Sequence, residues 1–295
     1  MNKFRDLEEP TAEMLLSLLE DAYEDEVVID NLLYDFFEEL VDDFEELFDE
    51  FEEDEDLILG EPTNLRDHPR VYQEILKQEN ELWGVLTGAI MTTMVSLIGS
   101  SMQRSYRESM IKTYQLFEPY IPQARILGKE VPVQITDTYF TSNILPIPWC
   151  QDGKVYSQRL YSHVAQFQSK LNFILEKGIK EGKGYDWMVA SWRKLTGSLA
   201  YDAARLIKTE TVAMWSQATK AAYLNMGIVY IEIVGDAACG QICTSYVGEV
   251  IPLRDAELGD ELPPYHPNCA CSYIAYEEVA DEEIEVEVEL EMVND

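Results

Sequence analysis

Four cysteines and one histidine lie close together in the C-terminal part of the sequence. Cys239 and Cys243 form a first pair with three residues between them, and His266, Cys269 and Cys271 follow in a His-x-x-Cys-x-Cys arrangement. Thiolate sulfur and imidazole nitrogen are the ligands that zinc prefers in structural sites. The cluster therefore predicts a tetrahedral zinc site. A second interpretation stays open, in which the thiols are small buried side chains and His266 is hydrogen-bonded in a proline-flanked loop.

The same residues also contain the groups of a thiol nucleophile. Cys269 or Cys271 could be activated by His266 if a third group, such as Glu210 or Asp236, orients the imidazole. Catalytic partners usually meet from distant segments, so adjacency in the sequence does not make a catalytic pair. The chain has no glycine-rich phosphate loop, no His-Glu-x-x-His motif and no Gly-x-Ser-x-Gly motif. We therefore expect a structural or interaction protein, with a thiol- or zinc-dependent hydrolase as the alternative.

The number of cysteines bears on the compartment. The chain has five, an odd number, and its first residues are followed by acids rather than by the apolar segment of a secretory signal. We expect a reducing compartment, in which metal binding or free thiols are favoured over disulfides.

The acidic residues are concentrated at the two ends of the chain. The formal net charge is -34, and residues 1–60 hold 24 acids and 2 bases while residues 277–295 hold 10 acids and no base. A chain this acidic is unsuited to coat nucleic acid or to bind an anionic membrane. Residues 101–220 carry 16 bases and 10 acids, and this stretch can meet DNA or the acidic ends of a neighbouring subunit. The acidic ends also raise a third possibility, an inhibitor that imitates DNA.

Hydrophobic periodicity predicts a mainly α fold with an α+β C-terminal domain. Apolar residues recur at helical spacing over 11–23, 31–51, 156–175 and 186–226, and the β-branched run 228–234 predicts a strand. We expect four parts, which are an acidic helical arm (1–60), a mainly helical region with a proline-rich extended insert at 119–153 (61–189), a domain with a small sheet and the Cys/His loop (190–275), and an acidic tail (276–295).

Two stretches leave more than one interpretation. Residues 82–103 contain no charged side chain and are long enough to span a membrane, but their serines, threonines and glycines favour a buried or subunit-interface helix. Residues 283–292 alternate acidic and apolar side chains, which is typical of a half-buried strand, although a disordered acidic tail fits equally.

The chain between 195 and 275 resembles the phage Mu F-like head morphogenesis family. The resemblance rests on a helix bearing Arg-x-x-x-Thr-Glu, a strand, an Asp followed by a Cys, a glycine turn and a closing His-Pro-Asn-Cys-x-Cys, where Ala270 replaces the arginine usual in the family. The residues that carry it are Arg205, Thr209, Glu210, Asp236, Gly248, Pro264, His266, Pro267, Cys269 and Cys271.

The resemblance implies a minor capsid protein of a tailed phage. Such a protein would sit in the virion at the portal vertex, after assembly in the host cytoplasm, and would assist procapsid assembly, DNA packaging or DNA ejection. Its implied partner is the portal protein, with capsid or scaffolding protein as further candidates. Within the motif, we expect Thr209 and Glu210 to tie their helix to the Cys/His loop through hydrogen bonds.

Overall fold

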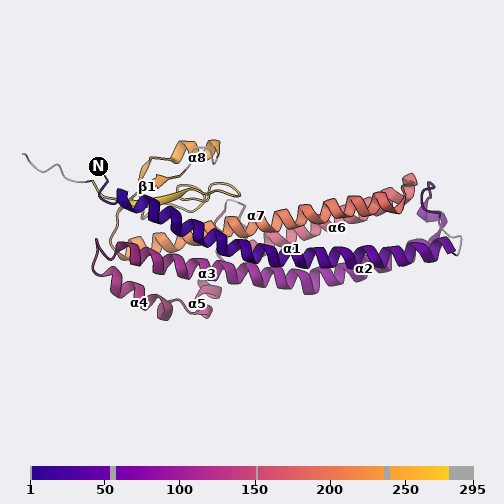
Figure 1. Ribbon diagram of the computed structural model, residues 1–295, viewed down its shortest axis with the longest axis horizontal. Coiled ribbons are helices and arrows are strands. Elements are labelled where there is room, and N and C mark those ends of the chain that lie inside the picture. Colours follow the sequence, from indigo (N-terminus) through magenta and orange to yellow (C-terminus); the bar gives the residue numbers. More distant parts are fainter. Residues whose placement is uncertain (1, 54–57, 151, 236–239, 279–295) are drawn as a thin grey trace, which may run out of the picture.

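The computed structural model describes residues 2–53, 58–150, 152–235 and 240–278. Its long helices form a bundle, and a small sheet lies at one end of that bundle (Figure 1). The predicted fold class, mainly α with an α+β part on the C-terminal side, is therefore confirmed. Asp236, Cys239 and the alternating stretch 283–292 fall outside the described residues.

The elements are short at the sheet end and long in the bundle. In chain order they are η1 (Arg5–Leu7), α1 (Glu8–Glu53), η2 (Leu65–Asp67), α2 (Pro69–Val85), the π-helical turn η3 (Leu86–Ile90), α3 (Met91–Phe117), α4 (Ala124–Gln134), α5 (Asp137–Asn143), α6 (Tyr156–Glu181), α7 (Tyr185–Asn225), β1 (Tyr230–Val234), α8 (Gln241–Tyr246), β2 (Val250–Pro252) and β3 (Ser272–Tyr276).

The first helix belongs to the bundle core. The two periodic runs at its start and end are parts of one helix, α1, which is 46 residues long and has Pro10 in its first turn. Its apolar stripe is buried on α7 and α3, and the ring of Phe44 lies 5.2 Å from that of Trp192. The turn near Gly60 therefore separates two helices of one core rather than an arm from a body.

The uncharged stretch 82–103 is buried on one side only. Every fourth residue from Leu82 through Leu86, Ile90, Met94 and Ile98 is buried, and most of the residues between them are exposed or half-buried. The continuous helix Pro69–Phe117 is long and apolar enough to cross a membrane, and 33% of its most apolar window is buried in the bundle. Length and composition alone are weak evidence for a membrane span, since core helices of soluble proteins meet the same criteria.

The segment 119–153 corrects the prediction of an extended insert. Helices α4 and α5 make up about half of it, and the described residues around them form turns and loops rather than strands. Buried Val131 anchors α4, and the Thr136 hydroxyl caps α5 by accepting a hydrogen bond from the Tyr139 amide at 3.1 Å. Packing against α3 and this cap outweigh the strand preference of the isoleucines and threonines.

The turn predicted at 176–185 is shorter than expected. Helix α6 continues to Glu181 and ends at Gly182, whose φ of 65° is in the left-handed region that favours glycine. The Lys183 amide closes the helix end by donating to the Gly178 carbonyl at 2.8 Å. Helix α7 then starts at Tyr185 and runs back through the centre of the bundle.

The sheet is antiparallel with strand order β2-β1-β3, and β1 is the predicted strand. It follows α7 after Gly227, whose φ of 80° ends the helix as predicted. The ring of Tyr273 on β3 packs 5.0 Å from that of Trp215 on α7. The sheet and the bundle thus share α7 and one hydrophobic core.

A pair of glutamates between α2 and α6 makes stability depend on pH. Burial and the neighbouring Glu176 raise the pKa of Glu79 from 4.5 to about 7. Between these values the folded state binds more protons than the unfolded state, so stability falls as the pH rises. We expect Glu79→Gln to raise the melting temperature by about 2 °C at pH 8 and by less at pH 5.

Differential scanning fluorimetry at the two pH values measures this effect. Glu81→Gln, a change at an exposed acid of the same helix, is the control and should leave both melting temperatures unchanged. An equal gain for Glu79→Gln at both pH values would contradict the prediction.

Candidate metal centre and adjoining cavity

Three cysteines converge between α8 and the loop that leads into β3. Cys243 comes from α8, and Cys269 and Cys271 come from the loop that leads into β3. The three sulfur atoms lie within 4.8 Å of one another, and all three side chains are buried. The Sγ atoms of Cys243 and Cys269 are 3.7 Å apart. The structure thus brings together three of the four predicted cysteine ligands, and the fourth, Cys239, lies outside the described residues.

His266 lies beside the cluster and contacts one of its three sulfur atoms. Its Nε2 atom lies 3.1 Å from Cys243 Sγ, and its Nδ1 atom lies 2.8 Å from the carbonyl oxygen of Pro267. If Nδ1 carries the proton and donates it to this carbonyl, Nε2 presents a lone pair towards the sulfur atoms. Histidines that bind metals commonly have such a second hydrogen bond, which fixes the tautomer.

The separation of the Cys243 and Cys269 sulfur atoms fits zinc. Zinc–sulfur bonds of about 2.3 Å in a tetrahedron place two sulfur atoms about 3.8 Å apart. The separation of Cys243 and Cys269 is close to this value. With the imidazole of His266, which contacts Cys243 but lies outside the group of three sulfur atoms, the three thiolates would make a Cys₃His donor set, one of the sets that bind structural zinc.

Two glycines allow the chain to approach the cluster closely. A Cβ atom on Gly240 would lie 3.2 Å from His266 Nε2, and one on Gly235 would lie 3.1 Å from Cys271 Sγ. These contacts are tight, so a side chain at either position would displace a donor. The donors are therefore enclosed by backbone on two sides.

The cluster favours the deprotonated, negatively charged form of one of its thiols. A hydrogen bond from Cys271 lowers the pKa of Cys269 to about 5 and raises the pKa of Cys271. A thiolate that is 1% exposed loses its hydration, which is costly unless a cation or hydrogen bonds compensate. A zinc ion would supply that cation and would hold the ligating thiols deprotonated.

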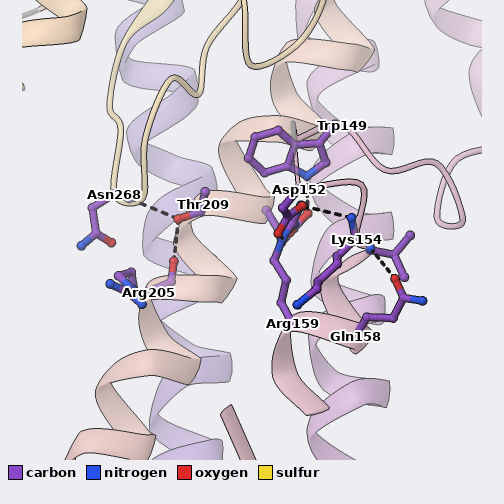
Figure 2. A network of polar contacts seen from close by, with 10 residues as sticks. Trp149, Asp152, Lys154, Gln158, Arg159, Arg205, Thr209 and Asn268 are labelled. Carbon is purple, nitrogen blue, oxygen red and sulfur yellow. Dashed lines mark hydrogen bonds and ion pairs between the residues drawn. The ribbon is translucent and has the colours of Figure 1, made fainter. Parts of the chain in front are cut away.

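Thr209 ties the Cys/His loop to α7, as predicted. Its hydroxyl donates to the Arg205 carbonyl at 2.7 Å and accepts a hydrogen bond from the Asn268 amide at 3.1 Å (Figure 2). Asn268 has a φ of 60°, and asparagine is one of the few residues that tolerate this region. One hydroxyl therefore holds the loop between His266 and Cys269 in place.

Glu210 does not reach that loop, which corrects the prediction for this residue. Its carboxylate is 1% exposed and accepts hydrogen bonds from Trp149 Nε1 at 2.8 Å and from Arg159 at 2.5 Å. Arg159 also binds Asp152 at 3.0 Å and stacks on the Trp149 ring (Figure 2). Burial raises the pKa of Glu210, and its hydrogen bond to Trp149 and its pairing with Arg159 counteract this effect.

The sequence indicated that Glu210 needs a buried partner, but it did not indicate which residues are its partners. A glutamate on the buried face of a helix requires a cationic partner, which is a usable signal. The partner, Arg159, is 51 residues away on α6, and Trp149 lies in the loop before it. Sequence spacing alone could not select these two among the other arginines and tryptophans.

A cavity of about 450 Å³ separates the ion-pair network from the Cys/His loop. Arg205 lies in its wall and pairs with Asp202 at 3.0 Å, while His163 Nδ1 lies 3.5 Å from the same aspartate. Arg205 therefore pairs with an acid within one turn of α7 and not with Glu210. His266 also lines the cavity, so a ligand there would meet the imidazole of the cluster.

The remaining motif residues shape the turns around the cavity. Gly248 has a φ of 87° in the turn between α8 and β2. Pro264 and Pro267 line the cavity, and Tyr265 between them stacks on Tyr246 with ring centroids 4.4 Å apart. Every described member of the motif thus lies in or beside one compact module.

No family model, curated protein or solved structure matches this chain. Its function therefore has to be inferred from its residues and their geometry.

Proposed function

We propose that the chain is a minor head protein of a tailed phage, located at the portal vertex, and that its Cys/His cluster holds a structural zinc ion. One observation carries the proposal. The motif residues that suggest the family meet in space, because Thr209 on α7 holds Asn268 in the loop that presents His266, Cys269 and Cys271. Residues selected at random from this sequence would not be expected to form one unit.

The architecture supports a structural role. The motif residues hold the Cys/His loop in place, and a long helical bundle extends from the module that contains this loop (Figure 1). An ion of this kind replaces part of the hydrophobic core that a small sheet cannot supply. Portal protein is the proposed main partner, and capsid or scaffolding protein is the proposed further one.

Binding to the portal protein tests the proposal. We expect the purified chain to form a saturable complex with the portal protein of the phage that encodes it, measured by analytical ultracentrifugation. Thr209→Val removes the hydroxyl that holds the loop and should weaken the complex. Thr93→Val is the matched control, because the hydroxyl of Thr93, at an exposed position of α3, makes a similar bond to the carbonyl four residues earlier. Absence of a complex at every concentration would contradict the proposal.

A thiol-dependent hydrolase is the second candidate, and one observation favours it. Cys243 Sγ lies 3.1 Å from His266 Nε2, and the same imidazole lines the cavity. The candidate thiol is then Cys243 rather than the two cysteines that the sequence suggested. It requires that iodoacetamide alkylates Cys243 in the folded, metal-free protein, and complete protection would exclude it.

A further inference from the structure

The outer face of α6 carries a basic stripe. Lys170, Lys177 and Lys180 recur at spacings of seven and three residues, which places them on one side of the helix with Phe173 between them. Phe173 is 62% exposed, and the buried residues of α6 alternate with this stripe on the opposite side. The stripe spans about 15 Å along the helix.

This stripe is not neutralised by the chain itself. Among the described residues, none of the three lysines makes an ion pair, and Lys177 lies 5.8 Å from the Phe173 ring centre. Other bases of the same region are paired, as Arg104 is with Asp25 at 2.7 Å and Arg159 is with Glu210. A patch of unneutralised lysines around an exposed aromatic ring is unusual in a chain with a net charge of -34.

The outer face of α1 has the complementary charge. Glu38, Asp42, Glu45 and Asp49 are exposed and recur at spacings of four, three and four residues, so they form one acidic stripe. Glu38 and Glu45 are seven residues apart, as are Lys170 and Lys177, and each pair therefore spans about 10 Å.

The two stripes lie at the same level of the bundle. The rings of Phe36 on α1 and Phe167 on α6 are 6.3 Å apart in the core, next to the start of each stripe. The Tyr185 hydroxyl at the start of α7 donates to the Val41 carbonyl at 2.5 Å, and α6 ends four residues before Tyr185. Both stripes thus lie in the half of the bundle away from the sheet, where Figure 1 shows the labelled parts of α1 and α6.

We infer that the Lys/Phe stripe of α6 binds the acidic stripe of α1 in a second copy of this chain. Within one chain no ion pair joins the two stripes among the described residues. Between copies the two stripes are opposite in charge, similar in length and at the same position along the bundle. Phe173 supplies an apolar contact inside the charged rim. Because the two surfaces differ, the contact is head-to-tail, and repeated side by side it closes into a ring if the rotation between neighbours allows it.

Sedimentation velocity of the full chain at low and high salt tests this inference. We expect species larger than the 33.9 kDa monomer at low ionic strength and a monomer at high ionic strength. The triple variant Lys170→Glu, Lys177→Glu, Lys180→Glu should associate at least tenfold more weakly. The control triple variant Lys77→Glu, Arg125→Glu, Lys129→Glu has the same net charge at exposed sites on α2 and α4 and should associate as the wild type does.

A charge swap makes the test specific. The variant Glu38→Lys, Glu45→Lys, Asp49→Lys should also fail to associate with itself. The reversed stripes of the two variants are complementary to each other, so a mixture of this variant with the α6 triple variant should associate although neither variant associates alone. A complex that appears only in the mixture supports the inference. Circular dichroism confirms that each variant is folded.

Two results would overturn the inference. The first is a wild-type chain that remains a monomer at low salt and high concentration. The second is a monomeric wild type that binds a fluorescent DNA duplex at low salt and loses this binding in the α6 triple variant, which would assign the stripe to nucleic acid. Neither result depends on whether the portal protein binds.

Discussion

Chelation of zinc from the purified protein is expected to lower its melting temperature by about 10 °C, because the ion would join the cysteine of α8 to the two cysteines of the loop before β3. We expect about one zinc ion per chain before chelation. The buried thiols of Cys243, Cys269 and Cys271 should react with a thiol reagent only after the metal is removed. Elemental analysis, thiol counting and differential scanning fluorimetry on one sample measure the three quantities.

Single substitutions separate the metal from a general loss of thiols. Cys269→Ser should reproduce the effect of chelation and should bind little zinc. Cys150→Ser is the control, because Cys150 is a half-buried free cysteine outside the cluster, and its variant should keep the metal and the melting temperature. A wild type without metal, whose melting temperature does not respond to chelator, would rule out the zinc ion and leave the hydrogen-bonded loop.

Glu210→Ala is expected to destabilise the protein by about 3–5 kcal/mol, because it leaves the half-buried Arg159 without its closest anion. The Trp149 indole would also lose its acceptor, so the loop before α6 would detach from α7. Chemical denaturation measures the free energy of unfolding. Glu50→Ala is the matched control, since the Glu50–Arg70 pair is more than half exposed and should contribute less than about 1 kcal/mol.

The double variant Glu210→Leu, Arg159→Met separates the effect of leaving a buried charge unpaired from the effect of losing side-chain volume. Replacing both charges by apolar groups of similar size removes the unpaired charge, so the double variant should be more stable than Glu210→Ala. If Glu210→Ala unfolds at the wild-type denaturant concentration, the ion pair has no structural role.

Much of the fold could be predicted because it depends on local periodicity. The stripe of α1, the length of α7, the glycine at the end of α7 and strand β1 all follow from residues that are neighbours in the sequence. Helices α4 and α5 could not be predicted in this way. Their β-branched residues favour strands, and packing on α3 together with the Thr136 cap selects the helix.

The candidate site divides in the same way. The cysteine spacing predicted the cluster, and the Thr209 hydroxyl was expected to reach the loop, since both are parts of one motif. The partner of Glu210 and the cavity depend on how α6 packs against α7. The sequence does not predict which residues of the two helices face each other. The basic stripe of α6 was visible only as a regional excess of bases until the helix placed three of them on one face.

Helix α7 connects the two ends of the molecule as one continuous helix. Its 41 residues extend about 60 Å without a break, from the distal tip of the bundle to the underside of the sheet. The residues that hold the Cys/His loop and the buried ion pair are Thr209 and Glu210, which both lie on this helix. The spacing between the distal tip and the Cys/His module is therefore set by one continuous helix, and it can change only if α7 bends or unwinds.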